Sequence, residues 1–356
     1  NVRDYRVLSY LPLAHSFERS CVEAASLYDG SAQIFFADAF ETFVQDLKRA
    51  RPTVFISVPR LWLKFQQGVF AKMPPAKLSR LLSIPIVRGM VKKKILTGLG
   101  LDQTLFAVGG AAPMPTSLLE WYGRLGLQII EGYGMSENCA VSHATLLGKP
   151  RPGTVGPPYD GVECRIAPDT GEIQMRGGCL MMGYYKSPEA TKETFTDDGW
   201  LKTGDKGTID GENNLRITGR VKDLFKTGKG KYVAPAPIED RLAVHPAIEA
   251  CCVTGANLGQ PLGLVMLNPD AAAKAKDPQG CAVLEASLTE HLKRVNAQLD
   301  PHEQMDCIVV TPEAWSVEND LLTPTMKVKR NKIEDTFAMN YEPWVGQRKK
   351  VIWAKG

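Results

Sequence analysis

The 356-residue sequence lacks the features that mark several broad classes of protein. It has no uninterrupted apolar run approaching the roughly 18 residues of a membrane-spanning helix. It has no run of like charge that resembles a nucleic-acid-binding tail, and its formal net charge is only +4. The sequence therefore predicts neither a membrane-spanning nor a nucleic-acid-binding protein, and an acidic small molecule suits its charge as well as a polymer does.

Cysteine pairs at metal-ligand spacing are also absent. The eight cysteines are scattered, and none forms a C-x-x-C pair or lies beside a histidine at the spacing of a metal site. They are predicted to be reduced thiols, which favours a cytoplasmic protein. No signal peptide opens the chain, and Asn1 runs directly into "VRDYRVLSYLPLAHSFE" without a Met. We expect this to be the interior of a longer sequence.

What the sequence does contain is an alternation of strand-like and helix-like segments. Strands are expected at 33–37 and 52–59, and helices at 41–50 and 60–72. This order favours an α/β domain with a parallel sheet covered by helices.

The texture changes twice further along the chain. From about residue 150, short apolar segments separated by Gly and Pro predict a β-rich subdomain. From Val221 the pattern becomes α+β. We therefore expect a large domain over 1–220, with an α/β sheet region at 1–149 and a β-rich subdomain at 150–220, followed by a small α+β domain over 221–356.

One segment of the first domain, "KLSRLLSIPIVRGMVKKKIL" (77–96), is basic and amphipathic and is broken by Pro85. A solvated pair of helices on the same domain is the favoured interpretation. Peripheral contact with an acidic membrane surface, at the inner membrane face, stays an open alternative. Oligomeric state is not addressed by any pattern in the sequence.

Two successive strand-like segments end in turns of small residues, "AVGGAAP" (107–113) and "QIIEGYGMSE" (128–137). In an open parallel sheet, ligands bind outside the carboxyl ends of the strands. Small residues at such a point allow close approach of the backbone to a ligand. The segment between them, 116–126, is predicted to be a helix with a Thr or Ser cap at its start.

Seven motifs, in order from one end of the chain to the other, carry a family resemblance. They are "YLPLAHSFE" (10–18), "EGYGMSE" (131–137), "GEIQMRG" (171–177), "GYYKSPEAT" (183–191), "DGWLKTGD" (198–205), "GRVKDLFKTGKGKYVAP" (219–235) and "TPTMKVKR" (323–330). The chain resembles the adenylate-forming, or AMP-binding, superfamily and, within it, the long-chain fatty acyl-CoA synthetases.

The resemblance implies a two-step reaction with ATP, Mg²⁺ and CoA. A fatty acid carboxylate and ATP give an acyl-adenylate and pyrophosphate, and the CoA thiol then attacks the acyl group. Two other readings stay open: a fatty acyl-AMP ligase that delivers to an acyl carrier protein, and a non-catalytic nucleotide-binding or acyl-binding remnant.

For the adenine, the resemblance implies a slot between an aromatic ring and a backbone wall. Tyr133 resembles the residue that stacks on the base, within a turn whose other implied members are Glu131, Gly132 and Gly134. The backbone of Gly110, Ala111 and Ala112 resembles the opposite wall. Without the motif, Tyr133 could equally be a core residue.

For the phosphates and ribose, the resemblance implies hydroxyl, carboxylate and guanidinium groups. Glu137 matches a Mg²⁺-linked carboxylate and Ser136 a phosphate-side hydroxyl; a capping pair at a helix start is the other reading. Asp205 matches the acid that accepts from both ribose hydroxyls, with Arg220 as its companion, and the two could lie on adjacent strands. In isolation they would be a turn Asp and a surface Arg.

The resemblance also implies a mobile small domain. Lys222 takes the position of its hinge, Lys327 that of the lysine that reaches the first domain during adenylation, and His15 a position near the acyl carboxylate and the thiol entry. The glycine-rich loop would pass the pantetheine arm of CoA through its residues Gly228, Lys229 and Gly230.

One expected element is missing from these 356 residues. The Ser/Thr/Gly-rich phosphate loop of the superfamily, which ends in Pro-Lys, should precede "YLPLAHSFE". Without that loop, we expect the chain to have negligible adenylation activity.

Overall fold

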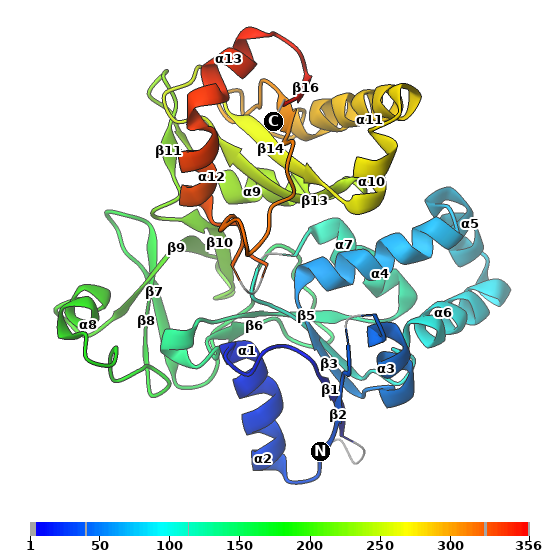
Figure 1. Ribbon diagram of the computed structural model, residues 1–356. Helices are drawn as coiled ribbons and strands as arrows, with labels where there is room; N and C mark the ends of the chain where they lie inside the picture. The colour runs from blue at the N-terminus through cyan, green and yellow to red at the C-terminus, as the bar shows by residue number, and fades with distance from the viewer. Residues whose placement is uncertain (1–4, 40, 113, 324–325, 355–356) are drawn as a thin grey trace. The chain divides into compact units, whose positions relative to one another are not determined.

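The computed structural model describes residues 5–39, 41–112, 114–323 and 326–354 (Figure 1). The chain divides into two compact units, Asn1–Ile217 and Thr218–Gly356. The division falls within strand β10 (Leu215–Arg220), three residues before the boundary that the sequence predicts.

The first unit is built on a six-stranded sheet in the order β2-β1-β3-β4-β5-β6. Neighbouring strands from β2 to β5 are parallel, and β6 is antiparallel to β5. The strands are β1 (Arg6–Ser9), β2 (Gln33–Phe36), β3 (Val54–Ser57), β4 (Phe106–Gly109), β5 (Ile129–Tyr133) and β6 (His143–Ala144). This sheet confirms the α/β fold predicted from the alternating pattern.

Helices between the strands cover this sheet, as parallel strands require. They are α1 (Ser16–Glu18), a π-helical turn (Arg19–Ala24), α2 (Ala25–Asp29), α3 (Phe43–Ala50), α4 (Pro59–Lys72), α5 (Pro75–Ser83), α6 (Pro85–Leu99) and α7 (Thr116–Leu125). The main core lies where α3 to α7 pack on β3 and β4, around Phe55, Trp62 and Tyr122. The Tyr122 hydroxyl donates to the carbonyl oxygen of Trp62 at 2.8 Å.

The β-rich subdomain is a meander, as the sequence predicts. Its strands lie in the order β10-β9-β8-β7, with β7 antiparallel to β8 and β8 antiparallel to β9. The elements are β7 (Val162–Ile166), β8 (Glu172–Gly177), α8 (Pro188–Thr194), β9 (Leu201–Ile209) and β10. A small core of Ile173, Met175 and Leu215 packs beneath it, against Tyr133 of the main sheet.

The second unit is an α+β domain, also as predicted. A mixed sheet in the order β13-β14-β15-β16 is apolar on both faces: along β15, Ile308 and Val310 enter one core and Val309 the other. Its elements are β11 (Phe225–Lys226), β12 (Tyr232–Val233), α9 (Pro235–Leu242), β13 (Ile248–Thr254), β14 (Leu262–Leu267), α10 (Pro269–Lys274), α11 (Pro278–Asn296), β15 (Ile308–Val310), α12 (Arg330–Phe337), α13 (Tyr341–Gly346) and β16 (Val351–Trp353).

Local predictions met different outcomes. The predicted Thr or Ser cap of α7 is wrong: Pro115 occupies the N-cap position, and no side chain caps the helix there. Pro85 does separate two helices, and it opens α6 because a proline needs no N–H partner at a helix start. All eight cysteines are free thiols. No helix among the described residues is long and apolar enough to cross a membrane.

Candidate functional site

The two small-residue turns lie side by side at the carboxyl ends of β4 and β5. These strands are parallel neighbours, with Gly109 opposite Glu131. A side chain at Gly110 would place its Cβ 3.2 Å from the carbonyl oxygen of Gly132, which is closer than nearly all real Cβ contacts. The two backbones therefore approach each other more closely than side chains would permit. Together the turns at Gly109–Gly110 and Glu131–Gly132 form one continuous backbone surface, the glycine ledge.

Gly134 has an even tighter environment. A Cβ at this position would lie 2.4 Å from the backbone carbonyl carbon of Ala140. The chain after β5 folds back on itself there, through the single 3₁₀ turn Ser136–Asn138 and the left-handed residues Cys139 and Ala140. Glycine at 134 is thus required by the return path of the loop, whatever ligand it serves.

Tyr133 and Asp205, which the sequence assigned to adenine and ribose, are in direct contact. The Tyr133 hydroxyl donates to Oδ2 of Asp205 at 2.6 Å, although 72 positions separate the two residues. Asp205 lies in the middle of β9, where its backbone N–H donates to the hydroxyl of Thr203. Burial and the neighbouring Asp205 carboxylate raise the pKa of Tyr133 well above its ordinary value, so the phenol stays protonated as the donor.

Glu131 lies two residues before Tyr133, and strand periodicity places both on one face. Its side chain is buried, and its backbone N–H donates to the hydroxyl of Thr145 at 2.8 Å. Burial raises the pKa of the Glu131 carboxyl to about 8, since no charge or hydrogen bond offsets the loss of water. At neutral pH this acid is therefore mostly protonated and can donate a hydrogen bond.

Ser136 and Glu137 lie on the short 3₁₀ turn that follows β5. Ser136 is exposed, and Glu137 is half-buried. Oε1 of Glu137 accepts from the Tyr184 hydroxyl at 2.6 Å. The capping alternative is wrong in detail, because the group that caps this turn is Asn138, whose Oδ1 accepts from the Met135 N–H at 2.8 Å.

The loop is held at its far end by the first helical segment. The Ser20 hydroxyl donates to the carbonyl oxygen of Cys139 at 2.6 Å, across 119 positions. Cys139 is the exposed cysteine of the eight; the other seven are half-buried or buried. The loop Ser136–Ala140 is therefore anchored on both sides, with its thiol open to solvent.

His15 caps α1 rather than lying unassigned in a loop. Its Nδ1 accepts from the Phe17 N–H at 3.2 Å. Phe17 is buried, and its ring lies 3.2 Å from where a Cβ at Gly110 would be. His15 lies two residues before Phe17, so the structure brings its segment, though not a contact of the imidazole itself, to the predicted site.

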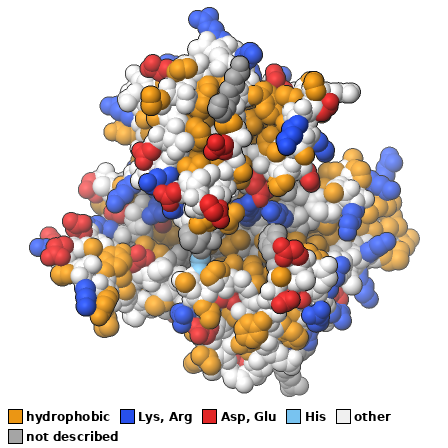
Figure 2. Space-filling model, in the orientation of Figure 1, with side chains coloured by type: hydrophobic (Ala, Val, Ile, Leu, Met, Phe, Trp, Pro, Cys, Tyr) orange, Lys and Arg blue, Asp and Glu red, His pale blue; other side chains and the backbone are white. Residues whose placement is uncertain are grey.

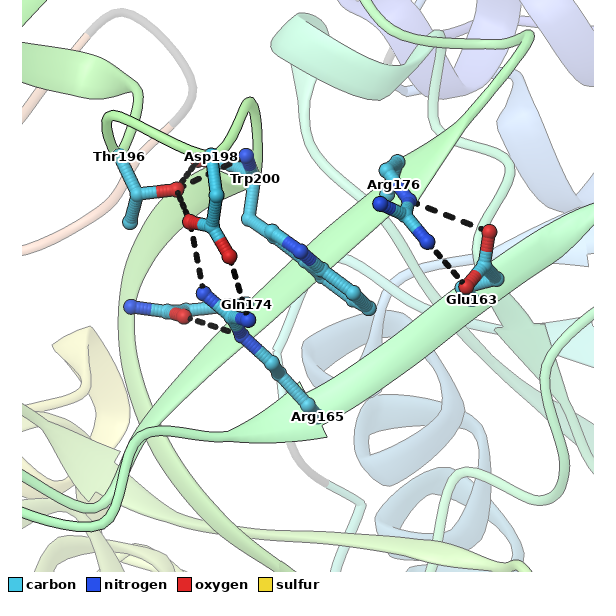
Figure 3. Close-up of polar contacts among 7 residues, drawn as sticks. All are labelled: Glu163, Arg165, Gln174, Arg176, Thr196, Asp198 and Trp200. Atoms are coloured by element: carbon cyan, nitrogen blue, oxygen red, sulfur yellow. Dashed lines mark hydrogen bonds and ion pairs between the residues drawn. The ribbon is translucent and has the colours of Figure 1, made fainter.

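A stacked cluster fixes the start of β9, the strand that carries Asp205 (Figure 3). The ring of Trp200 lies between two guanidinium groups, 4.3 Å from that of Arg165 and 4.7 Å from that of Arg176. Both arginines are held in turn by carboxylates, Arg165 by Asp198 and Arg176 by Glu163. The sequence alone does not reveal this cluster, since no local spacing shows that β7 and β8 present arginines to Trp200.

The remaining predicted residues belong to the second unit. Arg220 ends β10, and its carbonyl oxygen accepts from the Asp223 N–H at 3.3 Å in the turn that contains Lys222. Lys222 is exposed, as a hinge side chain should be. The turn is tied to the unit through Asp223, which pairs with the half-buried Arg330 at 3.7 Å. Arg330 also binds Glu239, so it connects this turn to α9.

The glycine-rich loop 228–230 follows β11. A Cβ at Gly228 would lie 2.6 Å from the carbonyl oxygen of Asn257, and Gly230 has a left-handed φ of 79°. Lys229 reaches Oε1 of Gln260 at 3.4 Å and is exposed. Both glycines are thus needed by the loop itself, independently of any thiol arm.

Lys327 is exposed and directly precedes Val328, which forms a β-bridge with Leu322. Its backbone N–H donates to the hydroxyl of Thr323 at 3.0 Å. The neighbouring Lys329 forms an ion pair with Asp320. The two lysines of "MKVKR", which the sequence could separate only by motif, thus differ in surroundings.

The described residues contain no preformed metal-binding cluster. Within the described residues, no group of three or more His, Cys, Asp or Glu side chains is arranged to hold an ion. The acid that the sequence proposed for Mg²⁺, Glu137, stands without a second acid in such a group. Its Oε1 accepts from the Tyr184 hydroxyl, and its backbone carbonyl oxygen accepts from the Met181 N–H.

Comparison with known proteins agrees with this geometry. Residues 1–185 match the AMP-binding enzyme family, and residues 222–342 match the AMP-binding enzyme C-terminal domain. Long-chain-fatty-acid–CoA ligase FadD15 of Mycobacterium bovis is 32% identical, over 95% of this chain and 62% of its own length. Long-chain-fatty-acid–CoA ligase 5 of Rattus norvegicus is also 32% identical, over 93% of this chain and 54% of its own length. The chain thus spans less than two thirds of these relatives.

Solved structures with the same fold are complexes of related enzymes. The A domain of carboxylic acid reductase from Segniliparus rugosus, in complex with AMP and a carboxylic acid, superposes with a TM-score of 0.77 at 23% identity, covering 96% of this chain and 54% of that one. ATP-bound MatB from Rhodopseudomonas palustris gives a TM-score of 0.68 at 25% identity, covering 95% of this chain and 61% of that one.

Proposed function

Because the chain belongs to the AMP-binding enzyme family, we propose that it serves the ATP-dependent activation of a long-chain fatty acid and the transfer of the acyl group to CoA. A carboxylate oxygen attacks the α-phosphorus of ATP, the bond to the β-phosphate breaks, and pyrophosphate leaves. The sulfur of CoA then attacks the acyl carbon, AMP leaves, and the thiol proton is released.

The observation that carries the proposal is the contact between Tyr133 and Asp205 beside the glycine ledge. A base on the Tyr133 ring would bring the ribose attached to it toward the same carboxylate. An ionised carboxylate has about four lone-pair sites on its two oxygens, so the acceptor chemistry of Asp205 suits two adjacent hydroxyls. An aromatic ring and an acid in this relation suit a nucleoside.

The side chains around the ledge support further roles. The backbone of Gly110, Ala111 and Ala112 would form the other wall of the base slot, and the exposed Ser136 would face the phosphates. Glu137 would contribute a single carboxylate oxygen to a Mg²⁺ ion held mainly by phosphates and water, the usual arrangement for this metal. That ion would supply neutralising charge to the phosphates.

The sharpest test is binding of the reaction intermediate, which needs no chemistry. The 356-residue chain is titrated calorimetrically with a non-hydrolysable acyl-sulfamoyl adenosine and with the 2′,3′-dideoxy form of the same compound. The wild-type chain is expected to bind the first roughly 10- to 100-fold more tightly, as hydrogen bonds to a charged acceptor contribute about 1.5–3 kcal/mol.

The same two compounds are then titrated into two variants of the chain. In Asp205→Asn the difference between the two compounds should shrink, because the charged acceptor is gone. Asp169→Asn, at an exposed turn position, should keep the full difference. Failure of the wild-type chain to bind the intact compound would reject the function, whereas equal binding of both compounds would reject the ribose role alone.

The acceptor is tested separately. With acyl-adenylate supplied, thioester formation is followed with free CoA and with an acyl carrier protein. Faster reaction with CoA is expected for a relative of long-chain-fatty-acid–CoA ligases. Transfer to the carrier protein alone would instead favour an acyl-AMP ligase.

A further inference from the structure

Helices α5 and α6 form a surface that the nucleotide site does not use. Both pack on the first unit through one face: Leu78 and Leu82 of α5 and Ile95 of α6 are buried in its main core. The opposite, exposed side of the two helices carries both apolar and basic side chains. It needs an explanation of its own, because large apolar side chains gathered at one place are uncommon on a soluble surface.

The apolar part of this surface lies around the corner between the two helices. Ile84 is 40% exposed, Ile86 is 86% exposed and Met90 is 65% exposed. Ile86 and Met90 are four residues apart on α6, so they lie on one face, one turn apart. The corner itself, Ser83 to Pro85, is exposed throughout, which makes it the outermost part of the pair.

The charge of this surface has one sign. Between Leu47 and Leu101 the sequence contains twelve Lys or Arg residues and no Asp or Glu. Six of the twelve belong to α5 and α6, and within the described part of the chain none of these six forms an ion pair: Lys77, Arg80, Arg88, Lys92, Lys93 and Lys94. In Figure 2, blue basic side chains surround orange apolar ones at the right-hand edge, where Figure 1 shows these helices.

These observations fit an anionic lipid bilayer better than other partners. Exposed apolar residues bordered by lysine and arginine are typical of helices that lie in the membrane interface. A nucleic acid would be bound by the charges but would leave Ile86 and Met90 in water. We propose that α5 and α6 form a docking surface for an anionic bilayer, with Ile86 and Met90 among the acyl chains and Lys93 and Lys94, three and four residues after Met90, against the headgroups.

This inference stands independently of the proposed function, and vesicle co-sedimentation tests it. The full chain is mixed with vesicles of phosphatidylcholine alone, or of two parts phosphatidylcholine to one part phosphatidylglycerol. Binding is expected to the anionic vesicles, to weaken as salt is added, and to be at least tenfold weaker to the neutral ones. Equal binding to both vesicle types would overturn the proposal, as would no binding to either.

Two variants separate the charged and apolar contributions. Each basic residue at an anionic surface contributes about fivefold to binding, so Lys93→Gln/Lys94→Gln is expected to bind roughly 25-fold more weakly. Ile86→Ser/Met90→Ser should lose roughly tenfold or more, since two apolar side chains leave the lipid. All four positions are exposed, so folding should be unaffected, as circular dichroism can verify.

A matched control uses exposed apolar residues elsewhere. Met339, 91% exposed, and Val283, 65% exposed, lie in the second unit. Met339→Ser/Val283→Ser should bind anionic vesicles like the wild type. A control as damaging as Ile86→Ser/Met90→Ser would overturn the assignment of the surface. The assignment would also be overturned if single-stranded RNA bound the wild-type chain more tightly than the vesicles do and bound Ile86→Ser/Met90→Ser equally well.

Discussion

Burial changes what Glu131 can do at neutral pH. A glutamate in water is already ionised at pH 7, but the Glu131 side chain is buried within β5, and this burial raises its pKa to about 8. The folded protein thus favours the protonated acid, while the unfolded chain favours the carboxylate above its ordinary pKa of 4.5. The free energy of unfolding changes with pH only where the two states bind different numbers of protons, and the cost accumulated over that range persists at higher pH.

A pH series of unfolding experiments tests this directly. The free energy of unfolding should fall as pH rises from 4.5 to about 8, and Glu131→Gln should remove that part of the slope. The variant is expected to gain on the wild type by roughly 1.4 kcal/mol per pH unit within the window, up to a few kcal/mol. Glu193→Gln, at an exposed position of α8, serves as the control. A constant offset at every pH would show that Glu131 is ionised in the fold.

At the scale of an element, the start of β9 depends on the Trp200 stack. Trp200→Ala should destabilise the first unit by about 3–5 kcal/mol, because it removes a buried ring. Arg165→Met should cost about 1–2 kcal/mol through its lost cation–π contact and its bonds to Asp198. Thermal unfolding of both variants and of the double variant gives their coupling. Arg151→Met, which breaks an exposed ion pair with Glu212, should stay within about 0.5 kcal/mol of the wild type.

Two glycines of neighbouring elements should respond in opposite ways to the same substitution. Gly123 lies within α7 with open space around its Cα, so Gly123→Ala is expected to stabilise by about 0.5–1 kcal/mol. Gly134→Ala should destabilise by several kcal/mol, because the new Cβ meets the backbone of Ala140. Denaturant titration of both variants measures the contrast. A tolerated alanine at 134 would mean that the loop can take another path.

Local pattern predicted the elements because each signal was itself local. Apolar periodicity sufficed for β2, β3, α3 and α4, and Gly/Pro spacing sufficed for the meander. The cap of α7 failed because Thr116 and a true N-cap look alike until the backbone of Pro115 is known. The capping role of Asn138 was missed for the same reason, since the sequence does not show which side chain turns back onto Met135.

The candidate site shows the same contrast between features that local sequence predicts and features that depend on the fold. The residues of one turn, Glu131 to Glu137, could be assigned by motif, and the structure does bring Tyr133 to Asp205 across 72 positions. The Tyr184 hydroxyl on Glu137 could not be foreseen, because the bond joins two motifs that no spacing relates. The protonated state of Glu131 was also out of reach, since burial is a property of the fold.

At the scale of the whole molecule, the chain consists of two units with separate cores, joined through β10. Under the proposed function, the two units would contribute differently to adenylate formation and to thioester formation. Lys327, in the second unit, would act only while ATP is being consumed, as a point charge near the α-phosphate.

This division predicts a split phenotype. In a form of the protein that makes acyl-adenylate from ATP, Lys327→Ala should reduce the rate of adenylate formation by roughly 100-fold or more. A loss of this size is expected when one electrostatic contact to the transition state is removed. Conversion of supplied acyl-adenylate to thioester should stay within about twofold. The two rates are measured as pyrophosphate release and thioester formation. Lys329→Ala, whose ion pair with Asp320 is structural, is the control, and equal loss in both steps would reject the assignment.

The anchored loop that ends at Cys139 has a practical consequence. Its thiol is the exposed one of eight and directly follows the turn of Ser136 and Glu137, while its backbone is fixed by Ser20. A maleimide fluorophore added under mild conditions would therefore label chiefly this position, without any engineered cysteine. The unmodified sequence already carries a place for a spectroscopic reporter at the edge of its proposed nucleotide site.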